Sequence, residues 1–167
     1  MNPKLACDAM CGGLARWLRV LGVDASYTPG IEDANLVAHA LAEGRVVISS
    51  DGKLFERKLF ANGELRGLPL PVGLRLHDQV RFVVRELRLT LGTPRCTLCN
   101  GELESVARGD VADVVPARSL IWATVFYRCR ACGHVFWEGT HWRRINALRE
   151  RLLGGENAPP TRLEETP

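Results

Sequence analysis

Two hydrophobic periodicities alternate along the first ninety residues. Short apolar runs, typical of buried strands, lie at residues 4–8, 24–28, 45–49 and 72–76. Between these runs, apolar residues recur every three or four positions, which is the spacing of one helix face. This second pattern predicts helices at residues 12–22, 34–43, 52–60 and 78–91, with a loop at 62–71.

The order of these segments indicates the fold class. The run "RVVIS" at residues 45–49 is β-branched and continuously apolar, as expected for a parallel strand buried on both faces. Asp33 stands where an N-cap would begin the second helix, and Gly44 stands where that helix would end. We therefore predict an α/β domain at residues 1–92, with a mostly parallel central sheet flanked by helices.

The pattern changes after "GTPRC" at residues 92–96. Strand-like stretches follow, and then a helical pattern; the strands are expected at residues 102–107, 119–129 and 133–139, and the helix at 141–153. We predict that residues 93–153 form a second, smaller module. The last residues, 154–167, have no apolar periodicity and are predicted to be disordered.

Four of the six cysteines occur as two C-x2-C pairs, Cys96 with Cys99 and Cys129 with Cys132, separated by 29 residues. Two such knuckles can place four thiolates at the corners of a tetrahedron, the geometry that zinc prefers. With the strand-like stretches around them, the pairs predict a zinc ribbon. Four thiolates leave no open coordination position, so this zinc would be structural. The alternative is four core or redox cysteines.

Basic and aromatic residues gather around the second cysteine pair. Arg130, His141, Trp142 and Arg143 could contact phosphates and stack on the bases of an RNA strand. Alternatively, Trp142 and the nearby Trp137 pack the ribbon onto the main domain. The sequence leaves both interpretations open.

Three aspartates occupy positions that a parallel sheet would bring to one edge. Asp8 ends the first predicted strand, Asp51 follows the "RVVIS" strand, and Asp33 opens the helix that precedes it. Functional groups of α/β sheets gather at the carboxyl ends of the strands. Clustered carboxylates need a cation, and hard oxygen ligands suit Mg²⁺ or Mn²⁺. Separately, each aspartate could be only a cap or a turn residue.

Composition narrows the function classes without choosing one. The chain is 46% hydrophobic, enough for a core, and its formal charge of +3 permits an anionic partner such as nucleic acid. No apolar run reaches the 18 residues that a membrane span needs. The first ten residues lack the apolar core of a signal peptide, so we expect a cytoplasmic protein.

The stretch "DAMCGGLARWLRVLGVDASY" resembles the opening of the Mut7-C RNase family of PIN-like domains. The stretch from Asp33 to Asp51 is similar to the PIN pattern of aspartate, helix, strand and aspartate, and "WEGTHW" at 137–142 is similar to a motif that follows the family's zinc ribbon. The resemblance implies a metal-dependent ribonuclease with a catalytic Mg²⁺ or Mn²⁺. It carries the roles of catalytic metal ligands to Asp8, Asp33 and Asp51, and of RNA-phosphate contacts to Arg16 and Arg19.

The sequence also departs from the family pattern. Gly13 stands where the family usually has arginine, and Ser50 replaces the arginine of a Thr-Arg-Asp motif. Many PIN nucleases have a fourth acid, for which Glu32, Glu56 and Asp78 are the candidates. These changes remove positive charge near the expected site and leave its acid set incomplete.

The expected function is an endoribonuclease in which the ribbon helps to hold RNA; tRNA, rRNA and mRNA are not distinguished. One alternative is a non-catalytic RNA-binding protein. Another is a toxin-like nuclease that a small antitoxin-like protein inhibits. A redox protein that uses the C-x2-C pairs is a third.

Overall fold

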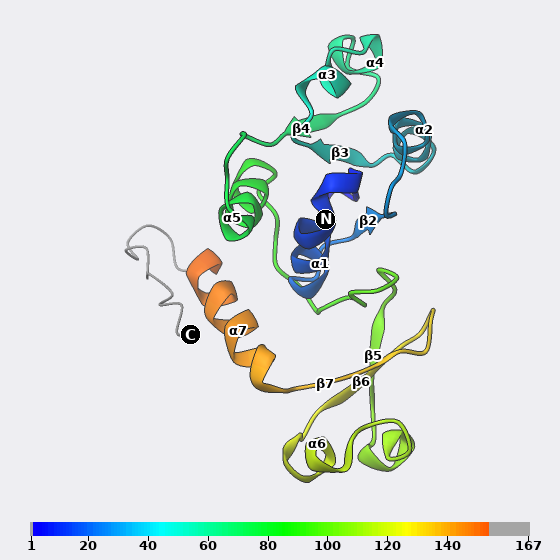
Figure 1. Ribbon diagram of the computed structural model, residues 1–167, viewed down its shortest axis with the longest axis vertical. Coiled ribbons are helices and arrows are strands. Elements are labelled where there is room, and N and C mark those ends of the chain that lie inside the picture. The colour runs from blue at the N-terminus through cyan, green and yellow to red at the C-terminus, as the bar shows by residue number, and fades with distance from the viewer. Residues whose placement is uncertain (1, 154–167) are drawn as a thin grey trace.

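The structure, a computed structural model, describes residues 2–153, apart from the side chains of residues 140–144, 152 and 153. The expected disorder of residues 154–167 concerns a segment outside the described residues. Two sheets follow one another along the long axis (Figure 1). The first belongs to an α/β part made by the N-terminal half of the chain, and the second to a cysteine-rich ribbon.

The first sheet consists of four short parallel strands in the order β2-β1-β3-β4. Their bounds are Leu5–Cys7 for β1, Ala25–Tyr27 for β2, Val46–Ser49 for β3 and Gly67–Pro69 for β4. β1 and β3 are central and completely buried, which explains their continuously apolar sequences. The predicted α/β class with a parallel central sheet is therefore confirmed.

Helices cover both faces of this sheet. The helices are α1 (Gly12–Val20), α2 (Asp33–Glu43), α3 (Gly52–Phe55), α4 (Lys58–Ala61) and α5 (Leu76–Glu86), and the short 3-10 helix η1 (Ala9–Cys11) precedes α1. Alternate strand residues point to opposite layers: Leu5 and Cys7 pack with α1 and α5, whereas Ala6 packs with α2. No helix in the described part of the chain is long and apolar enough to cross a membrane.

The structure corrects the prediction for residues 52–91. The fourth strand is Gly67–Pro69, within the expected loop, whereas the expected strand at 72–76 is mainly a turn. Val72 is 90% exposed there, so its apolar character does not indicate burial. Proline is tolerated in β4 because this strand lies at the sheet edge. The helix expected at 52–60 is divided into α3 and α4, and α5 ends five residues before the expected Leu91.

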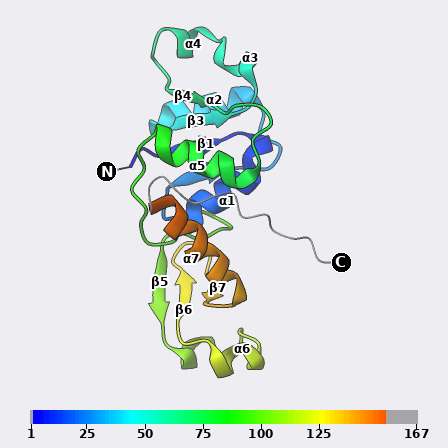
Figure 2. The same cartoon turned by 90° about the vertical axis from the view of Figure 1, so that its left-hand side faces the viewer.

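The ribbon is a three-stranded antiparallel sheet in the order β5-β6-β7. Its elements are β5 (Leu103–Val106), η2 (Arg108–Val111), α6 (Ala117–Trp122), β6 (Phe126–Cys129) and β7 (Val135–Trp137). The strand predicted at 119–129 is wrong in its first half, where a helix begins after Pro116, a residue that favours a helix start. α7 (Thr140–Leu153) then runs back from the ribbon towards the α/β part (Figure 2).

Buried polar contacts join the first cysteine knuckle to the α/β part. Arg19, at the end of α1, is 4% exposed, and its Nη1 donates to the carbonyl oxygens of Thr97 (2.9 Å) and Leu98 (3.2 Å). Its Nε donates to the Ala25 carbonyl at 2.8 Å. Burial lowers the pKa of Arg19, and nearby thiols oppose that shift. The guanidinium thus fastens α1 to the knuckle.

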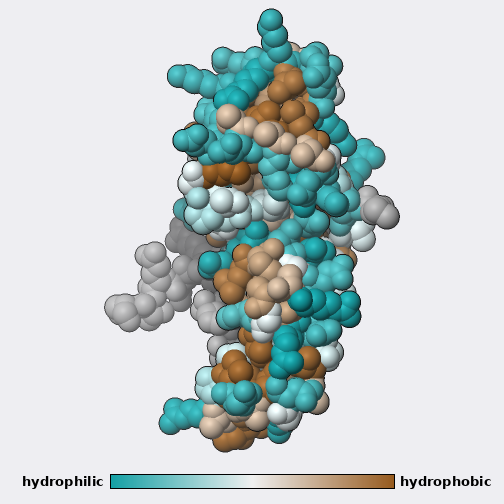
Figure 3. Space-filling model, turned by 90° about the vertical axis from the view of Figure 1, so that its right-hand side faces the viewer, coloured by the Kyte–Doolittle hydropathy of each residue, from teal (hydrophilic) through white to brown (hydrophobic). Residues whose placement is uncertain are grey.

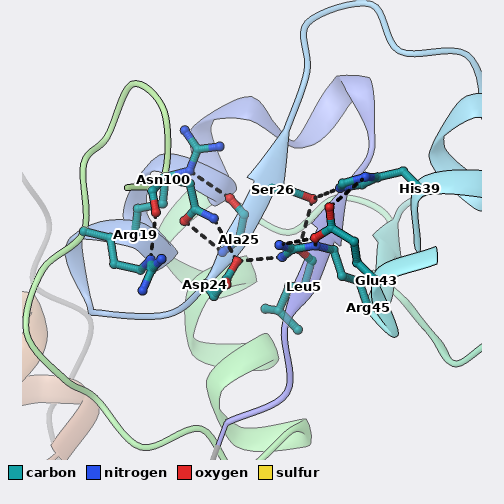
Figure 4. Close-up of polar contacts among 10 residues, drawn as sticks. Leu5, Arg19, Asp24, Ala25, Ser26, His39, Glu43, Arg45 and Asn100 are labelled. Carbon is teal, nitrogen blue, oxygen red and sulfur yellow. Dashed lines mark hydrogen bonds and ion pairs between the residues drawn. The ribbon is translucent and has the colours of Figure 1, made fainter. Parts of the chain in front are cut away.

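A second set of contacts lies beside Arg19 (Figure 4). Asn100 Nδ2 donates to Asp24 Oδ1 at 2.8 Å, and Asn100 Oδ1 accepts from the Ala25 amide at 3.2 Å. Arg45 Nη1 donates to the same Asp24 oxygen at 2.6 Å. Burial would raise the pKa of Asp24, but the hydrogen bonds from Arg45 and Asn100 hold it below its usual value. We call these contacts, with those of Arg19, the polar joint.

The polar joint predicts a stability difference between two arginines of α1. Arg19→Met should lower the free energy of unfolding by about 2–3 kcal/mol, because buried carbonyls lose charged donors. Arg16→Met should change it by less than about 0.5 kcal/mol, since Arg16 is exposed on the same helix. Urea denaturation of the zinc-loaded proteins measures both values. Equal stability of the two variants would show that the joint contributes little.

Candidate metal centre and aspartate site

The four predicted zinc ligands come together in space. The sulfur atoms of Cys96, Cys99, Cys129 and Cys132 all lie within 4.8 Å of one another. Cys96 Sγ lies 3.7 Å from Cys132 Sγ, and Cys99 Sγ lies 3.4 Å from Cys129 Sγ. Four thiolates about 2.3 Å from a tetrahedral zinc lie about 3.8 Å apart, so these separations are close to those that zinc requires.

The backbone of each knuckle forms a tight turn after the second cysteine. In the first, the Asn100 amide donates to the Cys96 carbonyl at 2.9 Å, and in the second the Gly133 amide donates to the Cys129 carbonyl at 2.9 Å. Both turn residues have positive φ, 68° at Asn100 and 74° at Gly133. Asparagine and glycine are the residues that accept this conformation most readily.

Gly101 has a different role, because it leaves room for the sulfur atoms. A Cβ at this position would lie 2.8 Å from Cys129 Sγ and 3.2 Å from Cys99 Sγ. These distances are too short for a real side chain beside two metal ligands. The cluster therefore includes a space that only glycine provides, and this supports a ligand set arranged around an ion.

The electrostatics of Cys129 also favour metal binding. Desolvation would raise the pKa of Cys129, but hydrogen bonds from the Cys132 and Ala131 amides lower it to about 7. A thiol with this pKa is substantially ionised near neutral pH, and thiolate is the form that binds metal. Burial and neighbouring thiols raise the pKa of Cys96 and Cys99, so these two ligands would release their protons as a cation binds. The four cysteines could thus hold a zinc ion, and they close its coordination sphere.

The remaining cysteines belong to the hydrophobic core. Cys7 and Cys11 are both buried in the cluster that α1 and α5 form with the sheet. Burial raises the pKa of both thiols, that of Cys11 to about 11, so they stay protonated at neutral pH. They are packing residues.

Two of the three predicted acids are linked by one serine. Ser49, fully buried at the end of β3, donates from Oγ to Asp8 Oδ2 at 2.5 Å and accepts from the Asp51 amide at 2.9 Å. Asp8 Oδ1 accepts from the Ala9 amide, and Asp51 Oδ1 accepts from the Lys53 amide. The carboxyl ends of β1 and β3 are thereby held together, and both carboxylates have fixed orientations.

Asp33 is the first residue of α2, not its N-cap, which is Glu32. Its carboxylate Oδ2 accepts from Arg57 Nη2 at 3.0 Å. Since Arg57 follows the helix that Asp51 caps, Asp33 lies at the same sheet edge as Asp8 and Asp51. Among the described residues, however, only the cysteines form a group of three or more candidate metal ligands within 4.8 Å.

The donor chemistry at this edge fits a hard cation, since carboxylate oxygens are the ligands that Mg²⁺ and Mn²⁺ prefer. Asp8 is 4% exposed, whereas Asp33 and Asp51 are half-buried. Asp33 forms an ion pair with Arg57. Joint ligation by all three aspartates therefore stays a prediction. The link through Ser49 was absent from the sequence interpretation.

The expected RNA contacts fall in different environments. Arg16 is exposed, and Arg130 is exposed but paired with Glu104 at 3.1 Å. Arg19 is buried in the polar joint, and its donors are directed to backbone carbonyls. It therefore does not face an RNA phosphate, contrary to what the resemblance implied. The side chains of His141, Trp142 and Arg143 lie outside the described residues. Trp137 packs against the ribbon's own core. That it packs the ribbon onto the main domain stays a prediction.

Comparison with known proteins identifies the family of this chain. A family model described as "Mut7-C RNAse domain" matches residues 3–149. A human protein described as "Exonuclease mut-7 homolog" is 33% identical over 102 residues, which are 58% of this chain and 12% of that protein. The matched region is thus a small part of the human relative. The resemblance seen in the sequence is confirmed.

The space at Gly101 predicts a selective loss of metal binding. Gly101→Ala should weaken zinc binding by about tenfold or more, since its Cβ would displace ligand sulfurs. Gly109→Ala is the matched control, because a Cβ there meets nothing within 4 Å. Competition with a chromogenic zinc chelator measures the affinity, and elemental analysis measures the content. Wild-type zinc affinity in Gly101→Ala would contradict this view of the cluster.

Proposed function

Since the chain belongs to the Mut7-C RNAse domain family, we propose that it is a metal-dependent endoribonuclease with a PIN-like catalytic domain. The family match over residues 3–149 is the observation that carries the proposal. The geometry at the carboxyl edge of the sheet supports it, because an oriented pair of aspartates lies where α/β proteins place their active sites.

Asp8, Asp51 and Asp33 are the residues that would hold the catalytic Mg²⁺ or Mn²⁺. Such a cation, when bound, stabilises charge on a phosphodiester and makes water a stronger nucleophile. Ser49 and the Ala9 amide fix the Asp8 carboxylate, and the Lys53 amide fixes that of Asp51. Hydrolysis at phosphorus is expected to leave a 5′-phosphate and a 3′-hydroxyl.

The cysteine cluster has a separate role in this proposal. Its four thiolates would hold a structural zinc with no position open to a substrate. Zinc binding would fix the first knuckle, whose carbonyls Arg19 contacts. The ribbon would then help to hold RNA while the aspartates act at the other edge of the parallel sheet.

The relative's description favours one other mode of cleavage. Because the human protein is described as an exonuclease, removal of nucleotides from an RNA end is the second candidate. A circular single-stranded RNA separates the two modes, since it has no end. Cleavage of the circle with Mg²⁺ or Mn²⁺ supports an endoribonuclease, whereas cleavage of the linear form alone supports an exonuclease.

The alternatives expected from the sequence are separated by related measurements. A non-catalytic RNA-binding protein would bind tRNA, rRNA or mRNA without metal-dependent cleavage. A toxin-like nuclease would arrest growth on expression, and a small antitoxin-like protein would copurify with it. That partner remains a prediction.

Asp8→Asn should lower the rate of RNA cleavage at least about a hundredfold, since several kcal/mol of charge stabilisation depends on this carboxylate. The amide oxygen of asparagine can still accept from the Ala9 amide, and its Nδ2 can donate to Ser49 Oγ in place of the hydrogen bond that Asp8 Oδ2 accepts, so the fold should persist. Asp113→Asn, an exposed change in the ribbon, should cleave at the wild-type rate. Gel assays with and without Mg²⁺ or Mn²⁺ give the rates. Full activity of Asp8→Asn would refute the assignment.

Ser49→Ala should lower activity about 10- to 100-fold, the usual effect of losing a residue that orients metal ligands. The reduction should lessen as the Mg²⁺ or Mn²⁺ concentration rises, because a positioning residue acts through cation affinity. The neighbouring Ser50→Ala is the control, since the Ser50 hydroxyl contacts Met10 and neither aspartate. A rate deficit independent of metal concentration would argue against the positioning role.

A further inference from the structure

A groove lies between α1 and the ribbon, separate from the aspartate edge. Its volume is ≈ 730 Å³, within the roughly 300–1,000 Å³ range of ligand pockets. α1 forms one wall, the 93–97 segment lies along it, and ribbon residues with Gly139 and Ile145 complete it. We call it the α1–ribbon groove.

Aromatic side chains from both parts of the chain line this groove. They are Trp17 from α1 and Trp122, Tyr127, Phe136 and Trp137 from the ribbon. Trp122 is 51% exposed, and its Cη2 atom would lie 3.7 Å from a Cβ at Gly139. A large indole surface is therefore available to a ligand. On the side of the molecule opposite to that in Figure 2, hydrophobic residues gather at the ribbon end, near the level of α6 (Figure 3).

The charged residues of the groove have one sign. Arg16 and Arg95 line it together with His134, and the described residues of its lining include no aspartate or glutamate. Arg95 Nε donates to the Asn100 carbonyl at 2.8 Å, so the metal knuckle holds this guanidinium in place. Arginine beside exposed aromatic rings complements a ligand with negative charge and flat apolar faces. A purely apolar peptide would offer no acceptor to the exposed Arg16 guanidinium.

We propose that the α1–ribbon groove binds unpaired bases of a single-stranded RNA, with Trp122 as a stacking surface and Arg16 and Arg95 as phosphate contacts. Base stacking on aromatic side chains and arginine contacts to the backbone are the usual means of binding single strands. Paired bases are already stacked within a duplex, so the groove selects unpaired segments. This inference rests on the proposed ribonuclease function and names its substrate class.

Asp8 lies before the N-terminal end of α1, whereas the groove lies along the middle and the C-terminal half of this helix. Asp8 precedes η1, which leads into α1, whereas Arg16 and Trp17 lie further along the helix. At about 1.5 Å per helical residue, Asp8 and Arg16 are separated by on the order of 12 Å along this direction. The groove would thus bind nucleotides beside the cleaved bond and would take no part in the chemistry.

Trp122→Ala and Ile121→Ala test the groove directly. Ile121 is the matched control, because it neighbours Trp122 in α6, is 79% exposed and does not line the groove. Fluorescence anisotropy of a labelled ten-residue oligouridine, with zinc-loaded protein and no added Mg²⁺ or Mn²⁺, gives Kd. Trp122→Ala should raise Kd by about 5-fold or more, as the loss of one stacked base implies. Ile121→Ala should leave it unchanged.

Two further measurements separate stacking from charge. An abasic strand of the same length should bind the wild type about as weakly as oligouridine binds Trp122→Ala. Arg16→Gln should reduce the salt slope of log Kd by about one, as expected when one phosphate contact is lost. Equal binding of oligouridine by Trp122→Ala and wild type, or equal binding of abasic and normal strands by the wild type, would overturn the proposal.

Binding and cleavage are measured separately, so failure of either proposal can be recognised. Trp122-dependent binding without cleavage would refute the nuclease and retain the groove. Cleavage with the same KM in Trp122→Ala and wild type would refute the groove and retain the nuclease.

Discussion

A buried guanidinium must find hydrogen-bond acceptors, and that requirement at Arg19 couples the two parts of this chain. Its acceptors are backbone carbonyls of the first cysteine knuckle and of Ala25. The knuckle therefore supplies polar groups that the end of α1 requires. A zinc ion held by the four cysteines would stabilise these contacts as well as the ribbon, because the same short loop carries both.

The polar joint and the aspartates occupy opposite edges of one parallel sheet. Asp24 and Arg45 stand just before β2 and β3, at the amino ends of the strands. Asp8 and Asp51 stand just after β1 and β3, at their carboxyl ends. Parallel strands have their amino ends at one edge of the sheet and their carboxyl ends at the other. Strands of three or four residues are therefore long enough to separate the polar joint from the candidate catalytic edge.

α1 connects these edges and also forms a wall of the groove. Its N-terminal end follows Asp8 and η1, and its C-terminal end carries Arg19. Between them, exposed Arg16 and half-buried Trp17 face the ribbon. A single-stranded RNA bound along α1 would contact both the α/β part and the ribbon. The family match spans both parts, in agreement with their function as a unit.

The sequence by itself determined the features that depend on local pattern. Strand–helix alternation gave the parallel α/β class, and the two C-x2-C pairs gave the four-thiolate cluster. β1 and β3 are buried on both faces, so their sequences are apolar and can be recognised as strands. The geometry of a cysteine knuckle depends on residues that are adjacent in the sequence, so the C-x2-C spacing predicts it. The position of β4 was not predictable in this way, because an exposed edge strand has no apolar pattern.

Only the tertiary structure decided what the long-range partners do. Arg19 and Arg16 are three residues apart on one helix, yet one is buried against carbonyls 78 residues away and the other is exposed. Ser49 gains its role from Asp8, 41 residues earlier. Trp122 becomes a candidate stacking surface because a short helix, and not the predicted strand, carries it to the groove. Side-chain partners across a sheet or between two modules depend on packing, which a local pattern does not record.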